Sequence, residues 1–300
     1  MAISLPAGFR VGHWTDPEAQ TGCTVILCPE RTVGGCDIRG NSPGSRELAL
    51  LDSNRTMPEV HALLLTGGSA FGLAAADGVM HFLEEREIGY ITPWARVPIV
   101  PAAVIYDLNV GSAKVRPTPA AGYAACEAAV VTVSSGRTGA GTGAVVGKWQ
   151  GMERSMRGGI GVAGDSIGDT LVVAIAVVNA VGDVLESDGS IIAGARGVRE
   201  TWAAAEQRVA LRMPLDPSPT NTTLVALLTN AQLSKVDANR LAMRGHDGMA
   251  RAVKPVHTSH DGDIVFTLAS GVHAGPFDSV AEMGADLTAE AIRNAVRVGP

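Results

Sequence analysis

The last third of the sequence alternates apolar runs of two kinds, and this alternation constrains the fold more than any other feature. Residues 222–229 and 263–269 are apolar runs of strand length, whereas 234–252 and 278–296 carry apolar side chains at helical spacing. Short apolar runs indicate buried strands, and a repeat every three or four residues indicates a helix with one buried face. A strand–helix–strand–helix order is typical of an α/β fold.

The earlier part of the chain adds further strands and helices. The expected elements are strands 23–28, 60–66, 170–182 and 185–193, and helices 72–87, 119–131 and 195–212. Gly182 and Asp183 form a turn dipeptide in reverse order, which favours pairing of the strands on either side of it as a hairpin. Neighbouring strands combined with strand–helix alternation indicate a mixed sheet.

The composition requires an interior built from small aliphatic side chains. Of the 300 residues, 46% are hydrophobic but only 4% are aromatic, and 36 are glycine. Ala, Val, Leu and Ile interleaved with glycine suit close packing of helices on sheets, and the chain is long enough to bury a sizeable core. A disordered chain would contain fewer aliphatic and more charged residues.

Charge and cysteine content argue against several classes of protein. The 24 Lys and Arg against 30 Asp and Glu give a net charge of −6 with no basic run, which disfavours nucleic-acid binding. The first residues lack a signal-peptide pattern, and the longest apolar run, 171–181, is too short to span a bilayer. The four cysteines include no CxxC pair, so neither a zinc site nor a disulfide framework is indicated. We therefore expect a soluble cytoplasmic protein.

Two local patterns suggest ligands but do not meet the requirements of a site. In the glycine-rich segment 136–149, Thr142 stands where a phosphate-binding P-loop requires glycine, and Trp149 follows the lysine where Ser or Thr would hold magnesium. His257 and His260 sit three positions apart in a segment expected to be a loop, a spacing that converges poorly on one metal ion. We expect both histidines to be solvated loop residues.

The proline-rich segment 213–221 leads directly into the apolar run that begins at Thr222. Its three prolines prevent regular structure, and Asn followed by Thr is an ordinary entry from a turn into a strand. If the bond between Asn221 and Thr222 is cut, however, Thr222 carries both a hydroxyl and a free α-amine. That amine, with a reference pKa of about 7.7–8.0, suits a general base. An exposed, strained linker before a rigid strand would favour such self-cleavage.

A series of motifs along the chain resembles those of a family of self-processing amidases. They are VGHWTD (11–16), TGCTVIL (21–27), RGNSPGSRE (39–47), LTGGSAFGLAAADGVMHFLEEREIG (65–89), VPIVPAAVIYDL (97–108), GAGTGA (139–144), VNAVGDV (178–184), NTT (221–223) and DGDIVFTLASG (261–271). This family includes L-aminopeptidase/D-amino-acid esterases, β-peptidyl aminopeptidases and nylon-oligomer (6-aminohexanoate) endohydrolases. The resemblance covers nearly the whole chain. It implies one domain over 1–300, a four-layer α/β/β/α sandwich of the Ntn-hydrolase-like type, and neither a cofactor nor a metal.

The resemblance also implies how the chain is activated. Thr222 is the implied nucleophile, freed by self-cleavage after Asn221 into an α chain, 1–221, and a β chain, 222–300. Asp261 and Asp263 match a pair of polar or acidic residues that follow the nucleophile. A carboxylate there would orient the Thr222 amine and hold the ammonium that forms when this amine takes a proton.

Three further residues match positions that the family uses at the same site. Asn179 is implied as an oxyanion-hole donor, and Tyr106 as an aromatic residue that assists it. Lys148 matches a lysine near the nucleophile, whose positive charge would lower the pKa of the amine or stabilise an oxyanion. By residue type alone, a hydrogen-bonded strand-end Asn, a core Tyr and a surface Lys are the ordinary alternatives.

One departure from the family pattern concerns the substrate. Aminopeptidase members carry an acidic residue shortly before the aromatic position, which anchors the substrate amine, whereas residues 101–105 are entirely apolar here. The expected function is therefore hydrolysis of linear amide or oligoamide bonds of the nylon-oligomer type, through an acyl-enzyme on Thr222.

Other functions remain as alternatives. One is an aminopeptidase acting on L-amino-acid or β-amino-acid amides and peptides. Another, more distant, is an acyltransferase of the ornithine acetyltransferase type, and a third is an unprocessed binding module. The resemblance further implies a tetramer of processed heterodimers, with a small amide, peptide or oligoamide as substrate and neither a nucleic-acid nor a membrane partner.

Overall fold

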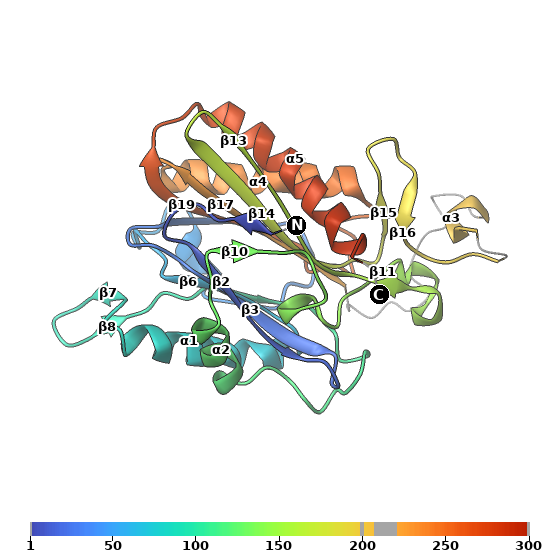
Figure 1. Cartoon of the computed structure of the whole chain (residues 1–300), viewed down its shortest axis with the longest axis horizontal. Helices are drawn as coiled ribbons and strands as arrows, with labels where there is room; N and C mark the ends of the chain where they lie inside the picture. The colour runs from blue at the N-terminus through green and yellow to red at the C-terminus, as the bar shows by residue number, and fades with distance from the viewer. Residues whose placement is uncertain (1, 199–200, 207–220, 299–300) are drawn as a thin grey trace.

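The computed structural model describes residues 2–198, 201–206 and 221–298, which form four layers in the order α/β/β/α (Figure 1). Two five-stranded sheets face each other in the middle. Helices α4 (Lys235–Ala252) and α5 (Phe277–Val296) cover the outer face of one sheet. Helices α1 (Ala75–Glu84) and α2 (Pro119–Glu127) cover the other. The four-layer sandwich implied by the sequence resemblance is confirmed.

The sheet beneath α4 and α5 brings the candidate residues together. Its strand order is β13 (Gly159–Ile167), β14 (Thr170–Asn179), β17 (Thr222–Ala231), β19 (Ile264–His273) and β4 (Val33–Ile38). Strands β17 and β19 are parallel, and all other neighbours in this sheet are antiparallel. The starts of β17 and β19 therefore meet at one edge, where the end of antiparallel β14 also lies. In the register, Asn179 pairs with Thr222.

The second sheet lies against the inner face of the first. Its order is β2 (Arg10–Asp16), β3 (Thr21–Leu27), β6 (Ala62–Thr66), β9 (Ala102–Val104) and β5 (Ser45–Arg46). One apolar cluster fills the space between the sheets, a second packs the first sheet against α4 and α5, and a third packs the second sheet against α1 and α2. Central strands such as β17 are thus buried on both faces, which explains their unbroken apolar sequence.

Short elements connect the layers. The remaining strands are β1 (Ile3–Ser4), β7 (Tyr90–Ile91), β8 (Arg96–Val97), β10 (Thr132–Val133), β11 (Val145–Val146), β12 (Met156–Arg157), β15 (Asp183–Leu185), β16 (Ile191–Ala193) and β18 (Val253–Lys254). The short helices are η1 (Leu48–Leu51), η2 (Ser69–Ala74), η3 (Gly139–Gly141), η4 (Lys148–Gln150), η5 (Met152–Arg154) and α3 (Ala203–Glu206). Of the helices in the described ranges, none has both the length and the apolar character needed to cross a bilayer.

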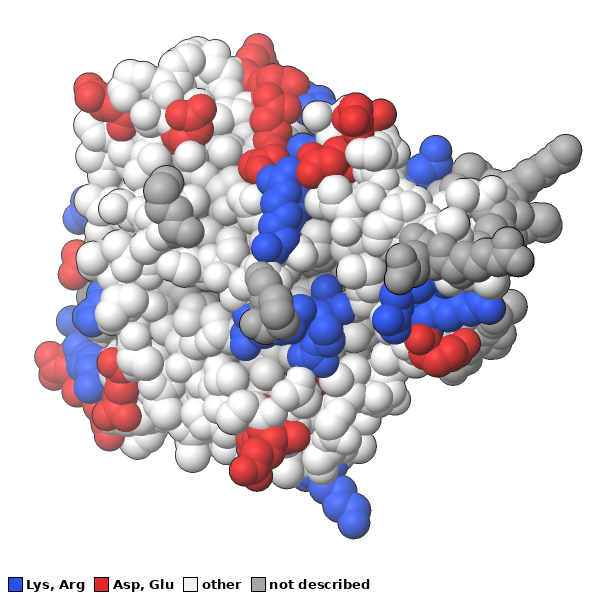
Figure 2. Space-filling model, turned by 45° about the vertical axis from the view of Figure 1, so that its right-hand side comes forward, with Lys and Arg blue, Asp and Glu red and all other residues white. Residues whose placement is uncertain are grey.

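Surface charge adds little to the stability of this arrangement. On the face shown in Figure 2, acidic and basic side chains are interspersed among wide uncharged areas. Ion pairs such as the one between Arg251 and Asp286, at 2.6 Å, join exposed side chains. Because water screens such pairs, they contribute little, and the three apolar clusters provide most of the driving force for folding.

Two expectations from the sequence are wrong. The expected hairpin between 170–182 and 185–193 does not form, because β14 pairs with β13 and β17 while β15 pairs with β16 and β18. The partner of β14 is β13, a strand that sequence reasoning missed because it contains three glycines and its second half is exposed. In the expected helix 195–212, only Ala203–Glu206 is helical among the described residues. Residues 207–212 and most of the linker, 213–220, lie outside the described residues.

Candidate active site

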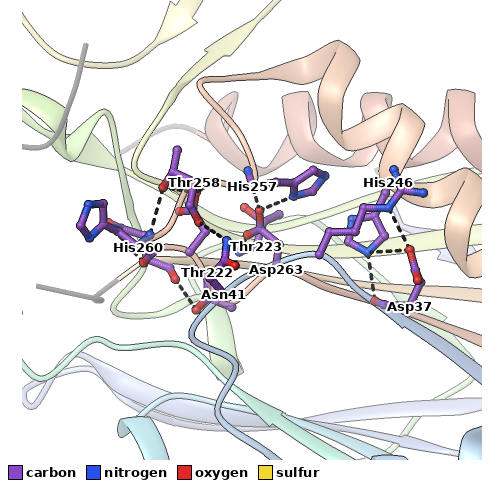
Figure 3. Close-up of polar contacts among 12 residues, drawn as sticks. Asp37, Asn41, Thr222, Thr223, His246, His257, Thr258, His260 and Asp263 are labelled. Carbon is purple, nitrogen blue, oxygen red and sulfur yellow. Dashed lines mark hydrogen bonds and ion pairs between the residues drawn. The ribbon is translucent and has the colours of Figure 1, made fainter. Parts of the chain in front are cut away.

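Thr222, labelled in Figure 3, is the first residue of β17, and its hydroxyl contacts the peptide group that precedes it. Thr222 Oγ1 donates a hydrogen bond to the carbonyl oxygen of Asn221 at 2.5 Å. The same carbonyl oxygen accepts the backbone N–H of Gly262 at 2.8 Å. Asn221 and Thr222 are only 4% and 5% exposed. The peptide between them is therefore buried, which corrects the expectation of an exposed linker at this bond.

Gly262 can lie against this hydroxyl only because it has no side chain. A Cβ at position 262 would stand 2.8 Å from Thr222 Oγ1 and 2.7 Å from the carbonyl oxygen of Ser42. Both distances are shorter than real Cβ contacts, so any larger residue would push the loop away from β17. The N–H of Gly262 could then no longer reach the Asn221 carbonyl.

Asp263 is fastened to the strand that carries Thr222. One carboxylate oxygen, Oδ1, accepts the backbone N–H of Thr223 at 2.7 Å. The other, Oδ2, accepts from Nδ1 of His257 at 2.8 Å and from the His257 backbone N–H at 3.3 Å. The residue is only 2% exposed, so these bonds replace the water that would otherwise surround the charge.

Asp261 precedes the same strand and is held from the other side. Its Oδ2 accepts the backbone N–H and the hydroxyl of Thr258, both at 2.7 Å. Burial, together with the neighbouring negative charge of Asp263, raises the pKa of Asp261 to about 6, against the opposing effect of the Thr258 bonds and of Lys148. Asp261 can therefore change its protonation state near neutral pH.

Lys148 reaches the site from η4 and contacts Asn179. Its Nζ donates to the backbone carbonyl of Asn179 at 2.9 Å and to Oδ1 of the same residue at 3.0 Å. Lys148 is only 8% exposed, so it is not the surface lysine that its residue type alone would suggest. Burial lowers its pKa to about 7, although the carboxylates of Asp261 and Asp263 act in the opposite direction.

Asn179 connects Lys148 to the loop that contains Tyr106. Asn179 Oδ1 also accepts the backbone N–H of Val145 at 3.1 Å, and Nδ2 donates to the backbone carbonyl of Tyr106 at 3.1 Å. Tyr106 thus enters the network through its main chain. The next residue, Asp107, fixes this loop because its carboxylate accepts the Gly68 N–H at 2.6 Å.

Five of the six residues expected to be catalytic lie in one network of hydrogen bonds and neighbouring charges, with Tyr106 at its edge. Sequence reasoning missed His257, Thr258 and Gly262, which hold the two carboxylates and the Asn221 carbonyl. The expectation that His257 is solvated is wrong, because its ring binds the Asp263 carboxylate. Among the described residues, no group of three His, Cys, Asp or Glu side chains is placed to hold a metal ion.

Comparisons with known proteins show the family of this chain. Residues 3–299 match the sequence profile of peptidase family S58. The chain belongs to peptidase family S58. A Mycobacterium bovis relative of this S58 peptidase, named an uncharacterized aminopeptidase, is 43% identical over 294 residues, or 92% of this chain and 83% of the relative. A 6-aminohexanoate-oligomer endohydrolase of Kocuria sp. is 36% identical over 271 residues, or 88% of this chain and 73% of the relative.

A solved structure supports the fold of this S58 peptidase. The L-aminopeptidase D-Ala-esterase/amidase from Ochrobactrum anthropi matches with a TM-score of 0.72, over 98% of this chain and 87% of that chain. The two sequences are 16% identical, and that structure is described as a variant of the Ntn-hydrolase fold. The S58 peptidase described here shares that fold, and its family and relatives show that it is a hydrolase acting on amide bonds.

Proposed function

We propose that this S58 peptidase cuts its own chain between Asn221 and Thr222, and that the exposed Thr222 then hydrolyses linear amide bonds. The observation that carries the proposal is the contact of the Thr222 hydroxyl with the carbonyl of the preceding peptide. Gly262 supports it, because its N–H already points at the oxygen that would become negative during attack.

Self-cleavage proceeds through an ester. Thr222 Oγ1 turns from the carbonyl oxygen to the carbonyl carbon of Asn221, bonds to it and loses its proton to a neighbouring base. The Thr222 nitrogen takes a proton as its bond to that carbon breaks, which leaves an ester and a free amine. Water then cleaves the ester into the Asn221 carboxylate and the Thr222 hydroxyl. Asp261 and Lys148, with pKa values of about 6 and 7, are suited to hold and release the proton near neutral pH.

The mature enzyme repeats this chemistry on a substrate. The Thr222 amine takes the hydroxyl proton while Oγ1 attacks the substrate carbonyl, and the leaving amine departs with a proton. Asp263, bound to the N–H of the next residue, orients the new amine and stabilises it when charged. We assign stabilisation of the oxyanion to the side-chain amide of Asn179, which Tyr106 assists by holding this amide through its carbonyl oxygen, with Lys148 beside them. Water then releases the acyl group from Thr222.

We propose linear oligoamides of the nylon-oligomer type as the substrates. Residues 101–105, where an acidic anchor for a substrate amine would be expected, are apolar and buried. The relatives named 6-aminohexanoate-oligomer endohydrolases support this choice. The relatives named aminopeptidases, which are more similar to this chain, favour the alternative of an aminopeptidase.

We also propose that the two chains stay together after cleavage. Strand β17 begins at the new terminus and lies between β14 of the α chain and β19 of the β chain. Its hydrogen bonds to both neighbours are unaffected by a cut before Thr222. The resulting heterodimer would be the unit of the expected tetramer, and we expect the enzyme to act in the cytoplasm.

Denaturing mass spectrometry of the purified protein tests the proposal. We expect wild type to give fragments 1–221 and 222–300, and Thr222→Ala to give one intact chain without amidase activity. Thr222→Ser, which keeps a hydroxyl, is the matched control and should still be cut. An active wild-type preparation that is continuous across this bond would refute the proposal. Rates on 6-aminohexanoate oligomers and on amino-acid p-nitroanilides then decide between oligoamidase and aminopeptidase.

A further inference from the structure

Two histidines lie behind Asp263, on the side away from Thr222 (Figure 3). We propose that His257 is a positioning residue for the Asp263 carboxylate and that the ring of His246 holds His257 in place. The inference rests on the proposed function, because it assumes that the orientation of Asp263 determines the reactivity of Thr222. It assigns to His257 a role that its place in an irregular loop does not suggest.

His257 binds a single carboxylate oxygen twice. Its ring Nδ1 and its backbone N both lie within hydrogen-bonding distance of Asp263 Oδ2, while Oδ1 accepts the backbone N–H of Thr223. A carboxylate held at both oxygens cannot rotate without breaking one of these bonds. His257 therefore fixes the plane of the carboxylate relative to the start of β17.

This double contact depends on an unusual backbone conformation. His257 has φ of 53°, in the left-handed region that residues with a side chain rarely adopt. In that conformation the backbone N–H and the ring of one residue face the same oxygen. Glycine tolerates this region best, and asparagine, aspartate and histidine are the residues with a side chain that adopt it most often. At this position histidine brings a ring nitrogen that reaches Asp263 while the backbone keeps this conformation.

His246 on α4 supports the imidazole of His257. The two rings meet edge to face with centroids 4.7 Å apart, and His246 is completely buried. Its Nε2 lies 2.9 Å from the carbonyl oxygen of Asp37 on β4. Burial lowers the pKa of His246 to about 4, so its ring is neutral and Nε2 carries the proton that this carbonyl accepts. Because the His246 ring is neutral and held by this hydrogen bond, it gives the His257 ring a rigid surface to pack against.

The Asp263 carboxylate also determines the tautomer of His257. Because Nδ1 faces a carboxylate, which only accepts hydrogen bonds, Nδ1 must carry the proton. Asp263 then receives three N–H donors, two from His257 and one from Thr223. The proposal therefore predicts a His257 ring protonated at Nδ1, an observable that does not depend on any variant.

Two substitutions at position 257 separate the hydrogen bond donated by the side chain from the effect of the left-handed backbone. His257→Gly and His257→Asn both tolerate the left-handed conformation, but only asparagine brings a side-chain N–H that can reach Asp263. We expect the glycine variant to slow self-cleavage about tenfold or more, and asparagine to restore most of the rate. With an amide substrate that wild type hydrolyses, the glycine variant should lose kcat with KM little changed. Equal rates for glycine and wild type, or equal losses in both variants, would overturn the proposal.

Two further measurements keep the outcomes distinct. Histidine-selective ¹⁵N NMR of wild type should show His257 protonated at Nδ1, and a ring protonated only at Nε2 would overturn the proposal even if the variants fail to fold. Thr222→Ala is measured in parallel. If Thr222→Ala is cut and active, the proposed function itself fails. If it is inert while His257→Gly equals wild type, only the positioning role of His257 fails.

Discussion

The buried lysine offers a test of the site that requires no substrate. Lys148 is held in the fold with a pKa of about 7, compared with its ordinary 10.5, because burial disfavours the ammonium. Lys148→Met keeps a side chain of similar length but removes the titrating group. The two proteins should therefore differ in how their free energy of unfolding changes with pH. Both chains carry Thr222→Ala, so that self-cleavage does not complicate unfolding.

The expected magnitude follows from the two pKa values. Between about pH 7 and 10.5 the unfolded chain keeps a proton on Lys148 that the folded chain has released, so stability rises with pH in this window. One pKa unit corresponds to about 1.4 kcal/mol, which gives about 5 kcal/mol over the whole window. At pH 7 the folded lysine is still partly charged, so the effect between pH 7 and 8.5 is smaller than the full slope. Over this range we expect the free energy of unfolding of the protein with Lys148 to rise by about 1.5 kcal/mol relative to the Lys148→Met variant.

Urea unfolding at pH 7 and 8.5 measures this difference. The raised pKa of Asp261 acts in a separate window, because the stability it contributes is lost as pH rises from about 4 to about 6. Ionisation of the four cysteines in the unfolded chain affects both proteins equally and cancels in the comparison. If the two proteins show the same change in stability between pH 7 and 8.5, the lysine is not buried as described.

Two other substitutions test the groups around the bond to be cut. Gly262→Ala should slow self-cleavage by about a hundredfold, because its Cβ would stand 2.8 Å from Thr222 Oγ1 and displace an oxyanion donor. Gly136→Ala is the matched control, because a Cβ at position 136 would meet no atom closer than 3.8 Å. Mass spectrometry over time measures the cleavage of both variants, and equal rates would contradict this prediction. Asn179→Ala should lower the free energy of unfolding by about 1–3 kcal/mol, because the Lys148 amine and the Val145 N–H lose their side-chain acceptor. Urea unfolding measures this loss, and unchanged stability would contradict the hydrogen bonds described.

The sequence predicted best the elements whose pattern of burial stays the same from one end to the other. Strand β17 and helices α4 and α5 were expected at nearly their observed bounds, because one periodicity runs through each of them. Strand β13 was missed because glycines reduce its apolar signal and its second half faces solvent. A strand of that kind is recognised only by its partner, which lies in another part of the sequence.

The sequence predicted the candidate reactive residues of the site but not the residues that hold them in place. Asp261 and Asp263 were found through the resemblance of long motifs, which spacing alone would not have provided. His257 was expected to be solvated because nothing in its local sequence reveals the left-handed backbone that turns it toward Asp263. Gly262 likewise reads as an ordinary turn residue until the Thr222 hydroxyl is found against it.

The topology explains how a cut at this bond can make an active site without taking it apart. A new chain terminus normally frays, because its first residues lose the constraint of the preceding peptide. Here the residue after the proposed nucleophile donates its N–H to a buried carboxylate, and Thr222 itself pairs with Asn179 on the neighbouring strand. Strand β17 is also bordered by β14 and β19, so the terminus begins inside a sheet. A free amine formed at Thr222 would therefore stay beside Asp263, which would orient it as it accepts the hydroxyl proton.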